Sequence, residues 1–327
     1  MLPMNLNIVC IVALCFLYNI QVNEGKKKWR ICAGKYKQRR GPFGDNSMNQ
    51  KSLYRYRDNN TNMVNYLRDW KYIQWERVRD VFLQVDRKDF VYDMPYQDIP
   101  KHLGYCSWIS SPHTTAHILD LCYLNLHRGA KVLEIGSGSG YMATLMAHLV
   151  GPTGHVTGLE HMIDICIESI ANVSRNHIGL IENQTIDIIH KDGRNGHAEG
   201  GPYDCIIASC AFPEWPTHLE DQLANGGRLV VPVGREGKLQ NLTIMDKLLK
   251  GTKYWFVEED CSFEPLMLAH EQEKRFVANQ HFATVLDNLT TTPRVIDRYW
   301  INSEALEEAD RAEYHRLKNS SGMSGSW

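Results

Sequence analysis

The 327-residue chain lacks several patterns that would assign it to a class at once. Its nine cysteines include no C-x-x-C pair, so they give no support to a zinc-ribbon or thioredoxin-like site. Its formal net charge is only −2, so no overall basic character points to nucleic acid. It has no internal repeat and no apolar run long enough for a stable membrane span. The 43% hydrophobic and 23% charged residues that remain are typical of a globular protein.

Residues 131–140 (KVLEIGSGSG) also lack the marks of a phosphate-binding loop. A dinucleotide fingerprint would need glycine at the position of Tyr141, and no Walker lysine follows the glycines. What is present is a short apolar strand, three alternating glycines and an apolar stretch, 141–150, that predicts a helix. Such a unit lets a ligand approach backbone N–H groups at the start of a helix. An ordinary strand-to-helix turn is the alternative interpretation of this stretch taken alone.

The acid inside this strand, Glu134, narrows the class of ligand. A carboxylate at the carboxyl end of a strand repels a phosphate group and attracts a cation. A ligand with an ammonium or sulfonium group fits such a site, which points to S-adenosylmethionine. A second acid, Glu160, ends the next predicted strand, 20 residues after Gly140. That is where α/β nucleotide sites place the carboxylate that binds ribose hydroxyls.

Strands and helices alternate through the centre of the chain, and this predicts an α/β fold with a doubly wound, mostly parallel sheet. We expect the turns after the first strands to open at one edge of the sheet and form a single cleft. Gly226 and Gly227 predict a tight turn. The predicted elements after the glycine turn are strands at 156–160, 185–189, 204–208 and 229–233, helices at 163–176 and 215–223, and closing strands at 241–246, 255–257 and 263–266.

The two ends of the chain differ from its centre. Residues 1–25 contain an apolar run whose length suits a signal-peptide core, although the basic residues follow this run instead of preceding it. A secretory signal and an untranslocated extension both stay open. Residues 26–61 are interpreted as a basic flexible arm, 62–267 as the folded domain, which starts with a helical segment, and 268–327 as a helical extension.

With these pieces in place, the chain resembles the protein-L-isoaspartate (D-aspartate) O-methyltransferases, which are class I S-adenosylmethionine-dependent enzymes with a Rossmann-like fold. The similarity runs from about residue 72 to 266. Its most specific piece is Ile109 to His113 (ISSPH), which is similar to the family's T-I-S-x-P-H segment. The other matching segments are 132–140, 158–161 (GLEH), 192–194 (DGR), 226–229 (GGRL) and 263–266 (FEPL).

The resemblance implies methyl transfer to the free carboxylate of L-isoaspartyl and D-aspartyl residues, a protein-repair reaction of a cytoplasmic monomer. It implies isoaspartyl proteins or peptides as partners, no nucleic acid and no metal. It assigns Ser110 to the acceptor, because an alcohol orients a carboxylate without neutralising it. It assigns the cofactor to Ser107, Trp108, Ile109, Glu134, Gly136, Ser137, Gly138, Glu160, His161, Asp192, Gly193 and Arg194.

Two residues depart from the family pattern. Trp108 stands where the family has a threonine, and Thr115 where animal members commonly have a second histidine. The bulky ring beside the acceptor leaves a second interpretation open, that of a catalytically inactive relative acting as a binding or adaptor protein.

Four assignments also keep alternatives. Ser110 could be the cap of the following helix, and Asp192 an N-cap or turn residue. Glu134 could be the partner of a helix dipole or a lysine, and Glu160 a surface acid.

Overall fold

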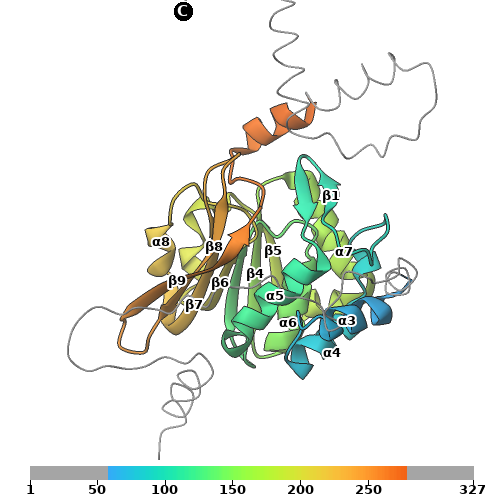
Figure 1. The fold of residues 1–327 in the computed structure, drawn as a ribbon, viewed down its shortest axis with the longest axis horizontal. Coiled ribbons are helices and arrows are strands. Elements are labelled where there is room, and N and C mark those ends of the chain that lie inside the picture. The colour runs from blue at the N-terminus through green and yellow to red at the C-terminus, as the bar shows by residue number, and fades with distance from the viewer. Residues whose placement is uncertain (1–57, 278–327) are drawn as a thin grey trace, which may run out of the picture.

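The structure, a computed structural model, describes residues 58–277 and is built around a seven-stranded sheet (Figure 1). The strand order is β5-β4-β3-β6-β7-β8-β9. The first five strands of this order are parallel and the last two are antiparallel. The prediction of a mostly parallel α/β sheet is therefore confirmed. The strands are β3 (Lys131–Ile135), β4 (His155–Glu160), β5 (Ile186–His190), β6 (Tyr203–Ala208), β7 (Leu223–Val233), β8 (Gln240–Lys247) and β9 (Lys253–Cys261).

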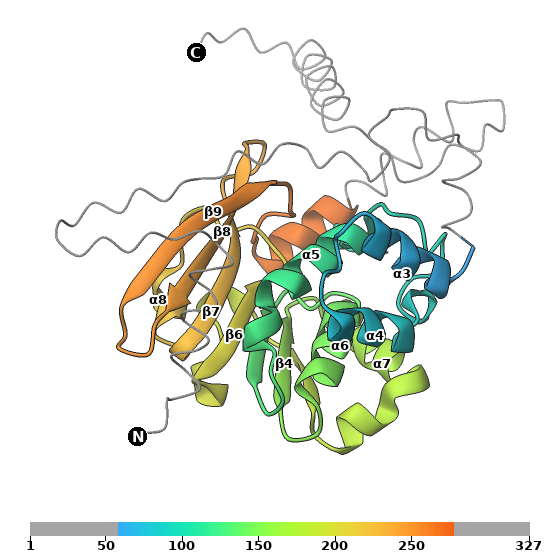
Figure 2. The same ribbon diagram turned by 60° about the horizontal axis from the view of Figure 1, so that its bottom comes forward.

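The helices cover the two faces of the sheet unequally. Successive residues of β3 point to opposite faces: Val132 joins one hydrophobic core and Leu133 the other. The first core also takes in five helices, which Figure 2 shows grouped together, whereas the second contains Leu219 of the short helix α8. The helices are α3 (Asn60–Asp69), α4 (Glu76–Gln84), α5 (Pro112–Cys122), α6 (Tyr141–Val150), α7 (Ile163–Glu182) and α8 (Thr217–Glu220).

The turn between β3 and α6 forms as its glycines predict. Gly140 is the N-cap of α6, and its φ of 82° lies in the left-handed region that glycine adopts at little cost. A Cβ atom at this position would lie 2.5 Å from Ser169 Oγ and 3.2 Å from Val173 Cγ2 of α7. Gly140 therefore lets α7 pack closely against the start of α6.

We expect Gly140→Ala to lower the free energy of unfolding by about 2–4 kcal/mol, because the new methyl group adds left-handed strain to a steric clash. The matched control is Gly179→Ala inside α7, where a Cβ atom would meet nothing within 4 Å. Alanine should stabilise that helical position by up to about 1 kcal/mol. Urea denaturation measures both changes, and a Gly140→Ala protein as stable as the wild type would contradict this packing.

Three details of the sequence-based prediction are wrong. Residues 96–103, rich in proline and aspartate, predict a loop, yet the chain forms a hairpin here, of β1 (Lys101–Gly104) and β2 (Ser107–Ile109). Gly226 and Gly227 lie inside β7, where the pairing with β6 shifts register, so they form an irregularity and not a turn. Of the predicted helix 215–223, only α8 is helical, because β7 already begins at Leu223.

The predicted closing strands at 241–246 and 255–257 lie within β8 and β9, whereas 263–266 contributes only a single bridge, between Pro265 and Ala211. Residues 269–277 form one more helix. The interpretations of residues 1–25, and most of those for 26–61 and 268–327, lie outside the described residues.

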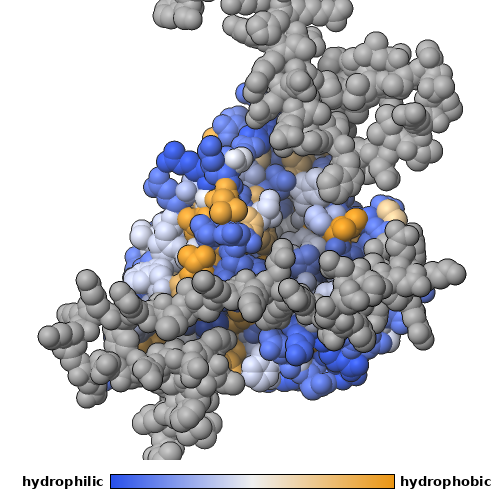
Figure 3. Space-filling model, in the orientation of Figure 1, coloured by the Kyte–Doolittle hydropathy of each residue, from blue (hydrophilic) through white to orange (hydrophobic). Residues whose placement is uncertain are grey.

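The face of the described residues that is visible in Figure 3 is mainly hydrophilic, with apolar residues in small separate groups. None of the helices between residues 58 and 277 combines the length and the apolar character that crossing a membrane requires.

Candidate functional site

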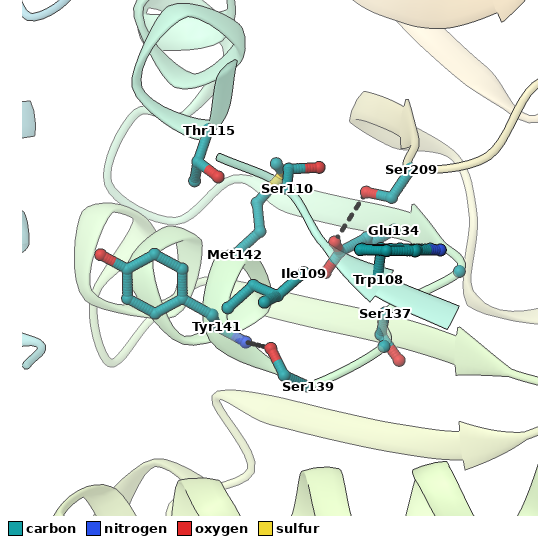
Figure 4. A pocket seen from close by; sticks show the side chains of 12 residues that line it. Trp108, Ile109, Ser110, Thr115, Glu134, Ser137, Ser139, Tyr141, Met142 and Ser209 are labelled. Carbon is teal, nitrogen blue, oxygen red and sulfur yellow. Dashed lines mark hydrogen bonds between the residues drawn. The ribbon is translucent and has the colours of Figure 1, made fainter. Parts of the chain in front are cut away.

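A cavity lies where the β1–β2 hairpin meets the glycine turn after β3 (Figure 4). Its walls come from β2 and the residues after it, the start of α5, the turn with the first residues of α6, and the loop after β6. More than half of the predicted site residues are among those that line it. The lining residues are Trp108, Ile109, Ser110, Thr115, Glu134, Gly136, Ser137, Gly138, Ser139, Tyr141, Met142 and Ser209.

Glu134 is the acidic side chain among the described residues that line this cavity, and it is only 1% exposed. The Ser209 hydroxyl donates a hydrogen bond to its Oε1 at 3.0 Å, whereas within residues 58–277 its Oε2 has no side-chain partner. Burial raises the pKa of the Glu134 carboxyl to about 8, the negative charge of Glu160 adds to this, and the Ser209 hydrogen bond opposes it. A buried acid of this kind ionises readily only when a positive charge is bound beside it.

Ser110 lines the same cavity from the segment that follows β2. The N-cap of α5 is Ser111, so Ser110 is not the cap of that helix. Within the described chain its hydroxyl makes no hydrogen bond, but its backbone oxygen accepts one from Arg87 Nη2 at 2.7 Å. Arg87 is fully buried, with its guanidinium 5.1 Å from the centre of the Tyr141 ring. The backbone of Ser110 is therefore held while its alcohol stays available to a ligand.

Glu160 lies at the end of β4, beside the glycine turn, and is 5% exposed. Its Oε2 accepts a hydrogen bond from Gly138 N at 3.1 Å, and its Oε1 accepts one from Met162 N at 3.0 Å. A carboxylate has about four acceptor sites, so each oxygen can still accept from a hydroxyl group. Two strand ends thus bring Glu134 and Glu160 to one edge of the sheet, as the parallel topology predicts.

Asp192, Gly193 and Arg194 form the turn after β5 and do not line the cavity. Asp192 Oδ1 accepts a hydrogen bond from the Arg194 N–H at 2.9 Å, so one of its oxygens closes the turn. A Cβ atom on Gly193 would lie 2.6 Å from Ile135 Cγ2 of β3, so only glycine fits against the sheet here. The structure therefore shows the turn role of Asp192, and its role toward a ligand stays a prediction.

Ser107 and His161 also lie outside the cavity lining, and Gln272 links them. Gln272 Nε2 donates to Ser107 Oγ at 2.8 Å and to the Tyr105 backbone oxygen at 2.7 Å, and its Oε1 lies 2.7 Å from His161 Nε2. Gln272 is 6% exposed. Gln272 holds the hairpin to the end of β4. No sequence pattern marks it as a site residue, because it lies in a polar helical stretch.

The chemistry of the cavity wall suits a ligand that has a positive charge and other polar groups. Its one carboxylate is buried and partly unpartnered, and among the described residues no lysine, arginine or histidine lines it. The other polar side-chain groups in its wall are hydroxyls and the indole N–H of Trp108. The ammonium and sulfonium groups of S-adenosylmethionine match this chemistry, and a phosphate group does not.

Comparisons with known proteins agree with this chemistry. A family model described as protein-L-isoaspartate(D-aspartate) O-methyltransferase matches residues 58–273. A Caenorhabditis elegans protein-L-isoaspartate O-methyltransferase is 37% identical over 216 residues, which cover 66% of this chain and 96% of the relative. The Triticum aestivum enzyme of that name is 36% identical over 198 residues, covering 60% of this chain and 85% of the relative.

A similar fold is found among solved structures. A Plasmodium falciparum protein described as a protein-L-isoaspartate O-methyltransferase, in complex with S-adenosyl-L-homocysteine, superposes with a TM-score of 0.60. The two chains are 28% identical, and the match covers 64% of this chain and 99% of the other.

Proposed function

Because the chain belongs to the protein-L-isoaspartate(D-aspartate) O-methyltransferase family, we propose that it methylates the free carboxylate of L-isoaspartyl and D-aspartyl residues in damaged proteins, as a repair reaction. S-adenosylmethionine is the methyl donor, and isoaspartyl proteins or peptides are the partners. The observation that carries the proposal is the cavity itself, which brings Glu134 and Ser110 to one space (Figure 4).

The cofactor would be held by residues on two strand ends and in the turn between β3 and α6. Glu134 would pair with its methionine ammonium, and Glu160 would accept hydrogen bonds from its ribose hydroxyls. Asp192 and the backbone of the turn after β5 would meet the adenine. When bound, S-adenosylmethionine supplies a sulfonium methyl group, whose bond to sulfur breaks as the methyl bonds to a carboxylate oxygen.

The chain's own contribution is alignment and not proton transfer. The acceptor carboxylate is ionised at neutral pH, because carboxyl pKa values lie near about 4. No general base is therefore required. Ser110 would donate a hydrogen bond to one acceptor oxygen and leave the other in line with the methyl group. Holding two reactants in this way can supply roughly 7–11 kcal/mol of the barrier.

The proposal is tested with the full chain, S-adenosylmethionine labelled on its methyl group, and two peptides that differ only in an isoaspartyl or a normal aspartyl linkage. We expect label in the isoaspartyl peptide and not in its partner, in a form that mild base releases, as for a methyl ester. A protein that binds the cofactor but labels neither peptide would overturn the proposal.

We expect Glu160→Ala to weaken cofactor binding by about 1–3 kcal/mol, through the loss of charge-assisted hydrogen bonds to the ribose. The matched control is Glu168→Ala on the exposed side of α7, which should leave the dissociation constant unchanged. Isothermal titration calorimetry measures both, with thermal melts to show that the variants fold. If the wild type and Glu160→Ala bind the cofactor with equal affinity, Glu160 does not contact the cofactor.

A further inference from the structure

Trp108 lines the cavity at a position where the family motif has a threonine. We propose that the face of its indole ring, together with the Glu134 carboxylate, recognises the positive charge of the bound methyl donor. The ring would face the sulfonium group and the carboxylate would pair with the ammonium group. This inference rests on the proposed function and assigns a role to the residue that departs most from the motif.

The position of Trp108 supports this role. It belongs to β2 and lines the same cavity as Glu134 and Ser209. Figure 4 shows its ring edge-on among the side chains that line the cavity. The residue is 37% exposed, so its side chain is not packed into the hydrophobic core. A large aromatic ring therefore forms part of the wall of a cavity that also holds a buried acid.

The hairpin holds the ring in place and leaves a face open. His102 on β1 is the register partner of Trp108, and the two rings meet in a T-shaped contact, with centroids 5.1 Å apart and planes at 83°. Such a contact covers at most one face of the indole. His102 is itself fixed, since its Nδ1 accepts a hydrogen bond from Gly104 N at 3.1 Å. Burial lowers the pKa of His102, which favours the neutral ring beside Trp108.

The charges of the cavity favour a cation at this ring. Within the described residues the cavity wall contains one carboxylate and no basic side chain, and its remaining polar side-chain groups are hydroxyls and the indole N–H of Trp108 itself. Tryptophan is the aromatic residue that binds cations best on its face. The methyl donor carries a positive charge on sulfur, whereas the product, S-adenosylhomocysteine, has a neutral sulfur. A ring that binds this charge would give the donor a higher affinity than the product, and the product would then dissociate more readily.

The test is calorimetry on the full chain with S-adenosylmethionine and S-adenosylhomocysteine in separate titrations. We expect Trp108→Thr to lose roughly 5- to 30-fold in affinity for S-adenosylmethionine, the range that corresponds to a partly desolvated cation–π contact. Its affinity for S-adenosylhomocysteine should change less than about twofold. Trp108→Phe keeps an aromatic face and should retain most of the preference. Trp75→Thr is the matched control, because Trp75 is also 37% exposed but stacks on Tyr123 away from the cavity.

An equal loss for both ligands would overturn the inference, because the ring would then be only an apolar cover. No change for either ligand would overturn it as well. The calorimetry measures binding alone, so it tests this inference separately from the methylation reaction. A wild type that binds both ligands and methylates nothing would refute the proposed function but not this inference. A wild type that binds neither ligand would refute both.

Discussion

Cofactor affinity should fall about 50- to 100-fold when the pH is lowered from about 7.5 to about 5.5, because Glu134 must lose a proton to pair with an ammonium group. Burial raises the pKa of this carboxyl to about 8, so the free protein holds the proton over this range. Binding of the cation releases it, and a reaction that releases a proton is favoured as the pH rises. The slope should approach a tenfold change per pH unit below the pKa of Glu134.

Calorimetry across this pH range, in buffers of different ionisation enthalpy, measures both the affinity and the number of protons released. The control is Glu134→Gln, which keeps the shape of the side chain but cannot ionise. Its affinity should be lower near neutral pH and nearly independent of pH. The range stays below about pH 8, where the α-amino group of the cofactor begins to lose its own proton. If the affinity of the wild type and of Glu134→Gln changes equally with pH, Glu134 does not pair with the bound cation.

The second large effect is expected at the acceptor. Ser110→Ala should slow methyl transfer to an isoaspartyl peptide by about 100-fold, since a small misplacement of a reacting group costs about that factor. The dissociation constant of the cofactor should change less than about twofold. Arg87 binds the backbone oxygen of residue 110, so the segment should keep its path without the hydroxyl.

Ser111→Ala provides the matched control for that measurement. Its hydroxyl lies 2.8 Å from Thr114 Oγ1 and 3.1 Å from His113 Nδ1, so it serves the start of α5 and not the cavity. We expect this variant to transfer methyl groups at nearly the wild-type rate. If Ser110→Ala also does so, Ser110 has no part in orienting the acceptor.

The centre of the site could be predicted from the sequence because its signals are local. The apolar strand, the glycines and the apolar stretch 141–150 follow one another without a gap, and the structure places β3, the turn and α6 on those residues. Glu134 and Glu160 meet because parallel strands end at the same edge of a sheet, a consequence of topology that needs no knowledge of side-chain packing.

The hairpin that carries Trp108 could not be predicted in the same way. Its strands have only four and three residues, too few to show an alternating pattern. Its turn places Tyr105 and Cys106 at positive φ angles of 49° and 55°, where glycine or asparagine would have given the usual signal. The hairpin is held partly from Gln272, 165 residues after Ser107, and no local pattern reports such a contact.

The most direct test of the whole account is the rate of methyl transfer to an isoaspartyl peptide by the wild type and Trp108→Thr, side by side at saturating cofactor. If Trp108 acts on the affinity for the donor, the wild type transfers methyl groups and the variant reaches a similar rate once the cofactor saturates it. A wild type that is inactive while Trp108→Thr is active would show that the ring blocks the acceptor. Two inactive proteins that still bind the cofactor would contradict the enzymatic function and favour a binding or adaptor protein.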